Sequence, residues 1–133
     1  MPLVKINLRA GRTNEEKDAI AGAIQAALVE NLGIPDADRY QLFTEYSPDN
    51  FRHTRTFLGL NYTDQLLMIE ITFLAGRDDT IKKALLAAIN RNLVTAGVVG
   101  ADDVFVMITE IGLANLSFGQ GLAQRAPVPE TAG

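Results

Sequence analysis

Pro2 is the first residue of this chain that could do unusual chemistry. If the initiator Met1 is removed, and Met-Pro is a context in which it usually is, Pro2 becomes a free secondary amine at the start of the chain. Burial and nearby cations can lower the pKa of such an amine toward neutrality, where it can serve as a base or an acid. The alternative is that Pro2 is a mere N-terminal residue.

An internal repeat indicates which residues could meet Pro2. Residues 4–46 align with residues 69–111 at a constant offset of 65 and without a gap. Pro2 corresponds to Leu67 of the second unit, so one unit can carry a terminal amine and the other cannot. Identical residues at equivalent positions include Ile6/Ile71, Gly11/Gly76, Arg12/Arg77, Lys17/Lys82, Asp38/Asp103 and Glu45/Glu110.

Two arginines, Arg12 and Arg77, follow the first predicted strand of each unit in matching Ala-Gly-Arg segments. If the first strands pair antiparallel, as an internal pseudo-twofold axis would require, Arg77 comes near Pro2 and Arg12 comes near Leu67. An arginine beside Pro2 could bind both oxygens of a substrate carboxylate and lower the pKa of the amine. Alternatively, both arginines are surface charges at helix starts.

Asp38 precedes the second strand of the first unit, and Asp103 is its equivalent in the second. Asp38 is the better functional candidate because it belongs to the unit that carries Pro2, although either aspartate could be a turn or cap residue. The absence of cysteine excludes disulfides, thiolate catalysis and cysteine metal sites. His53 is interpreted as a solvated loop residue, and we predict no metal and no cofactor.

The hydrophobic pattern of each unit predicts a strand, a helix and a second strand. The first helix opens with a capping box, Thr13 to Glu16, and ends at Leu32-Gly33. The second helix can be capped by Asp78 or Asp79. The predicted strands span residues 3–8, 39–46, 67–73 and 104–111.

A strand, a crossover helix and a strand form a right-handed unit with parallel strands. Two such units predict an α+β fold with a four-stranded core sheet and two helices on one face. The 133 residues are enough for a single domain. Its predicted parts are β-α-β units at about 2–46 and 67–111, a linker at 47–66, a C-terminal hairpin at 112–125 and a mobile tail at 126–133.

The predicted sheet has more apolar side chains than one helix-covered face can bury. Its opposite face would therefore stay exposed in a monomer, which predicts oligomerisation. The apolar strand residues that cannot all point at the helices are Val4, Ile6, Leu8, Phe43, Ile69, Ile71, Phe73, Phe105 and Met107.

The net charge of −4 argues against nucleic acid or an anionic membrane as the main partner. The chain has no apolar run long enough to span a bilayer, and its start lacks the basic and apolar regions of a signal peptide. We therefore expect a cytoplasmic protein that binds small molecules and copies of itself.

The chain resembles the tautomerase superfamily, whose members are built from β-α-β units and use an amino-terminal proline. The resemblance covers nearly everything from Pro2 to about Gln124. It rests on the segments at 2–6, 10–13, 34–41, 44–46, 75–77, 108–111 and 117–121. The fused length and the segment Pro35-Asp36-Ala37-Asp38-Arg39-Tyr40-Gln41 look most like malonate semialdehyde decarboxylase and its relatives.

The resemblance implies roles for individual residues. Pro2 would be the protonated group that polarises a substrate carbonyl, Asp38 would assist, and Arg77 would bind the carboxylate. Phe118 and Gln120 would contact the substrate, Phe118 as an aromatic wall unless it is a core residue. One branch of the family carries an Arg-x-Arg pair where this chain has Leu74-Ala75-Gly76-Arg77, so only Arg77 is available for that role.

Three functions follow as alternatives. If Pro2 is cationic, it acts as an electrophile, which favours decarboxylation or hydration of a small oxo acid such as malonate semialdehyde. If Pro2 is neutral, it is a base and favours keto-enol tautomerisation of 2-oxo acids such as phenylpyruvate. The third alternative is a non-enzymatic oligomeric binding module with a retained Met1. The resemblance implies a homotrimer. Because Leu67 has no terminal amine, the repeat predicts one working site per chain and an inert pocket around Leu67 and Arg12.

Overall fold

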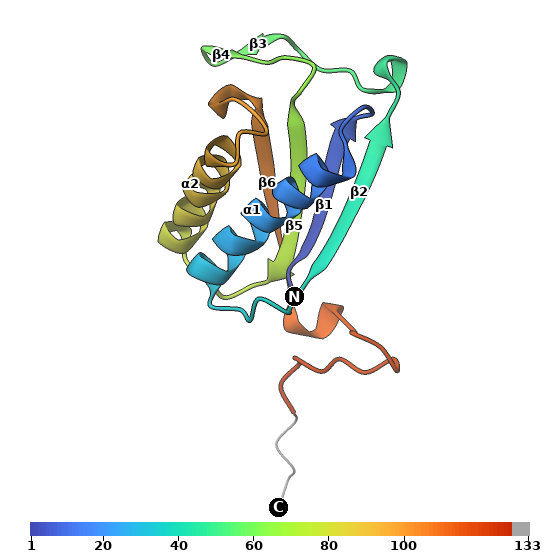
Figure 1. Ribbon diagram of the computed structural model, residues 1–133. Helices are drawn as coiled ribbons and strands as arrows, with labels where there is room; N and C mark the ends of the chain where they lie inside the picture. Colours follow the sequence, from blue (N-terminus) through green and yellow to red (C-terminus); the bar gives the residue numbers. More distant parts are fainter. Residues whose placement is uncertain (129–133) are drawn as a thin grey trace, which may run out of the picture.

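The two repeat units fold into the same three elements, as the repeat predicts (Figure 1). The computed structural model describes residues 1–128. In the first unit the elements are β1 (Leu3–Arg9), α1 (Asn14–Leu32) and β2 (Tyr40–Tyr46). In the second they are β5 (Leu67–Leu74), α2 (Asp79–Thr95) and β6 (Val104–Ile111).

The four long strands form one mixed sheet in the order β2-β1-β5-β6. Each unit pairs its own strands in parallel, and the two units join where β1 and β5 run antiparallel. Leu3 lies opposite Thr72 in this central pair. The start of β1 therefore lies beside the end of β5. This arrangement brings Pro2 and Arg77 to the same end of the two central strands.

Both helices cover the same face of the sheet (Figure 1). Alternate residues of β1 and β5 point at the helices and are fully buried, because side chains alternate between faces along a strand. Phe105 and Met107 of β6 point the other way and are exposed, as are Tyr40 and Leu42 of β2. The expected open face is thus present, although most of the apolar strand residues face the helices.

The helix caps follow the sequence prediction. Thr13 forms the full capping box with Glu16, and Asp78 caps α2 through the backbone N–H of Ile81. Gly33 ends α1 in the left-handed conformation, with φ of 68°. The four predicted strands of the two units and both predicted ends of the first helix therefore lie within a residue or two of the observed ones.

The turns that precede the helices repeat closely. Gly11 and Gly76 have φ of 130° and 132°, a backbone conformation that side chains other than glycine rarely adopt. Lys17 of α1 forms an ion pair with Glu45 of β2. The equivalent pair in the second unit joins α2 to β6. The repeat therefore preserves both the turn conformation and the ion pair that ties each helix to the last strand of its unit.

The linker 47–66 contains a 3-10 helix η1 (Pro48–Asn50) and a short hairpin of β3 (Thr56–Phe57) and β4 (Leu60–Asn61). A second 3-10 helix, η2 (Ala101–Asp103), leads into β6. No helix among residues 1–128 is both long and apolar enough to cross a membrane.

The predicted C-terminal hairpin at 112–125 is wrong. The segment forms a 3-10 helix η3 (Leu113–Asn115) followed by turns, and it adds no strand to the described part of the chain. Three consecutive residues, 119–121, have positive φ, which a strand does not tolerate. The Gln124 side chain bonds the Phe118 N–H and the Gly119 carbonyl in place of cross-strand bonds. Of the predicted mobile tail, residues 129–133 lie outside the described residues.

Candidate active site

The N-terminus of the chain lies against the carboxylate of Asp38. The Met1 nitrogen is 2.5 Å from both carboxylate oxygens, and Pro2 is buried directly behind it. The parallel register of β1 and β2 explains this contact, because Leu3 pairs with Tyr40 and so places the residues just before both strands side by side. Removal of Met1 would leave the Pro2 nitrogen as the terminal amine at this edge.

Arg77 approaches the same edge from the end of β5. It is half-buried, and its guanidinium carbon lies 5.2 Å from the centroid of the Phe73 ring. A cation over an aromatic face is attracted by the ring's negative π surface. Because Phe73 is fully buried, it gives the arginine a fixed support.

Met1, Asp38 and Arg77 line one cavity of about 380 Å³. A second cavity of about 200 Å³ adjoins it, and Met1 and Phe118 line both. Phe118 stacks on Tyr40 with the ring centroids 6.3 Å apart. The Met1 side chain, which borders both spaces, is only 8% exposed. The first cavity is lined by Met1, Leu32, Gly33, Ile34, Pro35, Asp38, Leu74, Arg77, Phe118 and Arg125.

Two arginine side chains that could bind an anion line the first cavity. Arg125 lines it together with Arg77, while the carboxylate of Asp38 is paired with the terminal ammonium. Arg125 is not among the site residues that the sequence predicts. It lies in an irregular segment without periodicity, so nothing in the sequence signals that it reaches the cavity.

Gln120 is not brought to the site. It is exposed, has φ of 59°, and is not among the residues that line either cavity. The structure therefore brings together Pro2, Asp38, Arg77 and Phe118 of the predicted site residues but not Gln120.

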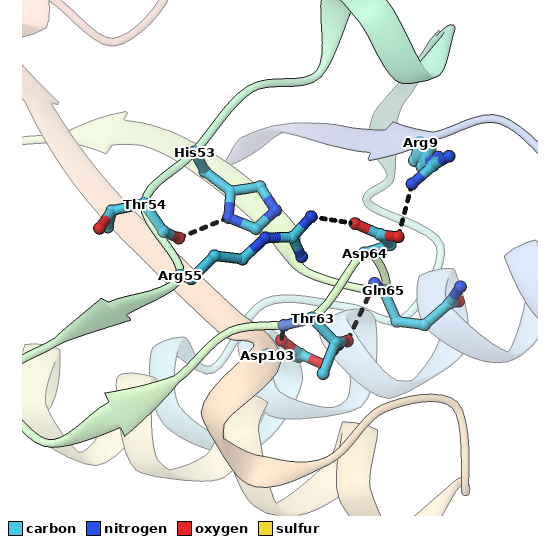
Figure 2. A network of polar contacts seen from close by, with 8 residues as sticks. All are labelled: Arg9, His53, Thr54, Arg55, Thr63, Asp64, Gln65 and Asp103. Atoms are coloured by element: carbon cyan, nitrogen blue, oxygen red, sulfur yellow. Dashed lines mark hydrogen bonds and ion pairs between the residues drawn. The ribbon is translucent and has the colours of Figure 1, made fainter.

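The equivalent region of the second unit is filled by the chain itself (Figure 2). Asp103, only 6% exposed, accepts hydrogen bonds from the backbone N–H of Thr63 at 2.8 Å and from its hydroxyl at 2.5 Å. The carboxylate that corresponds to Asp38 is thus used to hold the linker.

Arg12, the equivalent of Arg77, also binds the linker. It donates to the carbonyl of Gln65 at 2.6 Å and is 8% exposed. Burial lowers the pKa of Arg12, while the charges of Glu16 and Asp103 oppose that shift. Residues 63–65, which lead into Leu67, therefore bind both Asp103 and Arg12. The equivalent residues of the first unit, Asp38 and Arg77, line a cavity instead.

A larger cavity of about 480 Å³ lies elsewhere, on the open face of the sheet. Its lining includes Asn7, Tyr46, Glu70, Phe105 and Met107 but none of the predicted site residues. Within residues 1–128 there is no cluster of three or more His, Asp or Glu side chains that could hold a metal ion.

Comparison with known proteins identifies the family. Two family models, both described as tautomerase enzyme, match residues 38–119 and residues 2–53. The chain belongs to the tautomerase family. The probable tautomerase YusQ of Bacillus subtilis (strain 168) is 31% identical over 93% of this chain and 98% of its own length.

Solved structures of the tautomerase fold agree with the arrangement of elements. FG41 malonate semialdehyde decarboxylase inhibited by 3-bromopropiolate is 38% identical, with a TM-score of 0.84 over 92% of both chains. A second malonate semialdehyde decarboxylase, described for its decarboxylase and hydratase activities, is 27% identical, also with a TM-score of 0.84, over 92% of this chain and 94% of that one. The tandem β-α-β fold is therefore confirmed.

Proposed function

We propose that this protein, once Met1 is removed, is a cofactor-independent enzyme that acts on a small oxo acid through its terminal proline. The observation that carries the proposal is the contact between the chain's N-terminus and Asp38 inside a cavity that Arg77 also lines. An amine, a carboxylate and a guanidinium supply a proton carrier, a group to hold its charge, and an anion-binding group.

The favoured reaction is decarboxylation of malonate semialdehyde or a similar acid. Arg77 binds the substrate carboxylate, and the cationic Pro2 nitrogen donates a hydrogen bond to the aldehyde oxygen. The bond between the carboxylate carbon and the next carbon breaks, its electron pair forms the carbon–carbon double bond of an enol, and the Pro2 proton passes to the aldehyde oxygen as carbon dioxide leaves. The enol then takes a proton from solvent on carbon and returns its hydroxyl proton to Pro2, which gives the aldehyde product and the cationic amine again. Asp38 stabilises the cationic proline. The similarity to FG41 malonate semialdehyde decarboxylase supports this choice.

Keto-enol tautomerisation of a 2-oxo acid such as phenylpyruvate is the second candidate. The relative of Bacillus subtilis (strain 168) named as a probable tautomerase supports it. The same residues serve, but here the neutral Pro2 nitrogen removes a proton from carbon and returns it elsewhere on the substrate. The charge state of Pro2 distinguishes the two reactions.

We also propose that the protein is a cytoplasmic homotrimer. The apolar open face of the sheet, with Phe105 and Met107 exposed beside the 480 Å³ cavity, supports burial of this face against other copies. Light scattering at micromolar protein concentration should give three chains per particle, and a monomer would contradict the proposal.

Intact mass and one variant test the enzymatic proposal. The native protein should lack the mass of methionine, and Pro2→Ala should lose activity toward both malonate semialdehyde and phenylenolpyruvate while it keeps its oligomeric state. Retention of Met1 would favour a binding module instead, because an acylated Pro2 nitrogen can neither accept a proton nor carry a charge. Full activity of Pro2→Ala would refute the assignment.

A further inference from the structure

Gln25 is a buried polar residue in the middle of α1. It is 1% exposed and lies among apolar side chains of the helix's inner face. A buried amide is costly unless its hydrogen bonds are made. Its nitrogen donates to the carbonyl of Asp36 at 3.1 Å and to the carbonyl of Asp38 at 3.0 Å. Both amide hydrogens are thus used on the loop that carries the proposed active-site aspartate.

These two bonds constrain the backbone on either side of the Asp38 carboxylate. Within the loop itself the Asp38 N–H donates to the carbonyl of Pro35 at 3.0 Å. The exposed Arg39 side chain also donates to the Asp36 carbonyl at 3.1 Å and to the Asp36 carboxylate at 3.0 Å. Within residues 1–128 the carboxylate itself has one partner, the nitrogen of Met1. Once Met1 is removed, the Pro2 nitrogen becomes the terminal amine there, and the carboxylate can meet it only if the loop backbone, to which Gln25 contributes two hydrogen bonds, stays in place.

The second unit offers an internal comparison. Asn90 is the repeat equivalent of Gln25, and its amide donates to the carbonyl of Ala101 at 2.8 Å, the equivalent of the Asp36 carbonyl. The shorter asparagine makes only this one bond among the described residues. The carboxylate of Asp103 is held instead by Thr63. The longer, two-bond amide thus occurs in the unit whose aspartate faces a cavity.

We infer that Gln25 is a positioning residue, which holds the Asp38 loop so that the carboxylate faces the terminal amine. The inference rests on the proposed function, because it concerns the same proline site. A misplacement of about 1 Å at a catalytic group can cost about 100-fold in rate. Loss of the second bond should therefore affect the chemical step more than substrate binding, which is assigned to Arg77.

The test compares Gln25→Asn and Gln25→Leu with Asn90→Leu, in the processed protein with malonate semialdehyde and phenylenolpyruvate as probes. Gln25→Asn can reach one carbonyl only, as Asn90 does. We expect kcat to fall about 10- to 100-fold in both Gln25 variants, with KM within about twofold of the wild-type value. Asn90→Leu should keep kcat within about twofold. Circular dichroism and light scattering check that each variant folds and assembles.

A second readout separates positioning from general stability. The pH dependence of kcat should shift in Gln25→Asn because the Asp38 carboxylate no longer holds the proline's charge in the same way. An unchanged kcat and pH profile in a folded Gln25→Asn would overturn the inference, and this variant decides alone if Gln25→Leu does not fold. An equal loss in Asn90→Leu would also overturn it.

Asp38→Asn is measured alongside to separate two kinds of failure. If Asp38→Asn is inactive and the Gln25 variants are fully active, only the role of Gln25 is refuted. If Asp38→Asn keeps full activity, the proposed use of Asp38 fails, and the role of Gln25 fails with it.

Discussion

Replacement of Asp103 by asparagine should damage stability and leave catalysis intact. Asp103 is buried and accepts two hydrogen bonds from Thr63, one from the backbone and one from the hydroxyl. Hydrogen bonds to charged groups contribute about 1.5–3 kcal/mol each. Asparagine keeps one carbonyl oxygen and loses the charge, so we expect the free energy of unfolding to fall by about 2 kcal/mol. For a domain of this size that lowers Tm by about 8 °C.

The same substitution at Asp38 is the matched control, because the two aspartates are repeat equivalents. The Asp38 side chain is 25% exposed and faces the cavity, and a partly exposed ion pair contributes about 1 kcal/mol at most. Asp38→Asn should therefore lose at most about 1 kcal/mol of stability while kcat/KM falls about 100-fold or more.

Urea unfolding at fixed protein concentration and steady-state kinetics on the same samples measure both effects. Thr63→Ser keeps the N–H and the hydroxyl that bind Asp103, so it should be close to wild type in both assays. The reasoning is refuted if Asp103→Asn lowers kcat/KM as much as Asp38→Asn does, or if it unfolds at the wild-type urea concentration.

Three further substitutions test other parts of the account. The hydrogen bond from Arg55 lowers the pKa of Asp64, so that carboxylate stabilises the fold above about pH 4 and loses this effect as the pH falls through the lowered pKa. Asp64→Asn should therefore reduce the urea midpoint at pH 6, and the difference from wild type should shrink steadily as the pH falls below about 4. Phe73→Leu should lower the free energy of unfolding, measured in urea, by about 1–2 kcal/mol. Because it also removes the ring beneath Arg77, it should raise KM more than it lowers kcat, and a KM at the wild-type value would contradict the support of Arg77 by Phe73. Arg125→Gln should raise KM about 3- to 10-fold with kcat unchanged, and an unaltered KM would remove Arg125 from the site.

The repeat made most of the fold predictable. Gly11 and Gly76 recur because both turns need positive φ, and Lys17 and Lys82 recur because each ties its helix to the last strand of its unit. Once the first strands are paired antiparallel, the convergence of Pro2, Asp38 and Arg77 follows from register alone. The hydrophobic period and the internal repeat are therefore sufficient to predict the sheet and the end of it at which Pro2, Asp38 and Arg77 meet.

The remaining features depend on contacts that leave no periodic signal. Gln25 is one polar residue among apolar neighbours in α1. Nothing in the sequence indicates that its amide donates hydrogen bonds to the loop at Asp36 and Asp38. The filling of the second pocket depends on where residues 63–65 run, which is set by tertiary packing. The glycines around Gln120 predict a hairpin, yet consecutive positive φ values and side-chain bonds produce turns instead.

The ionisation of Pro2 is the most direct test of the central claim. The protein labelled with nitrogen-15 at proline, processed and assembled, can be titrated by NMR while kcat/KM for malonate semialdehyde and for phenylenolpyruvate is measured over the same pH range. We expect an ionisation in the rate profile to coincide with that of the Pro2 nitrogen, with activity in the cationic form for decarboxylation and in the neutral form for tautomerisation. A rate that does not change as Pro2 titrates would contradict both reactions and the role of the terminal amine.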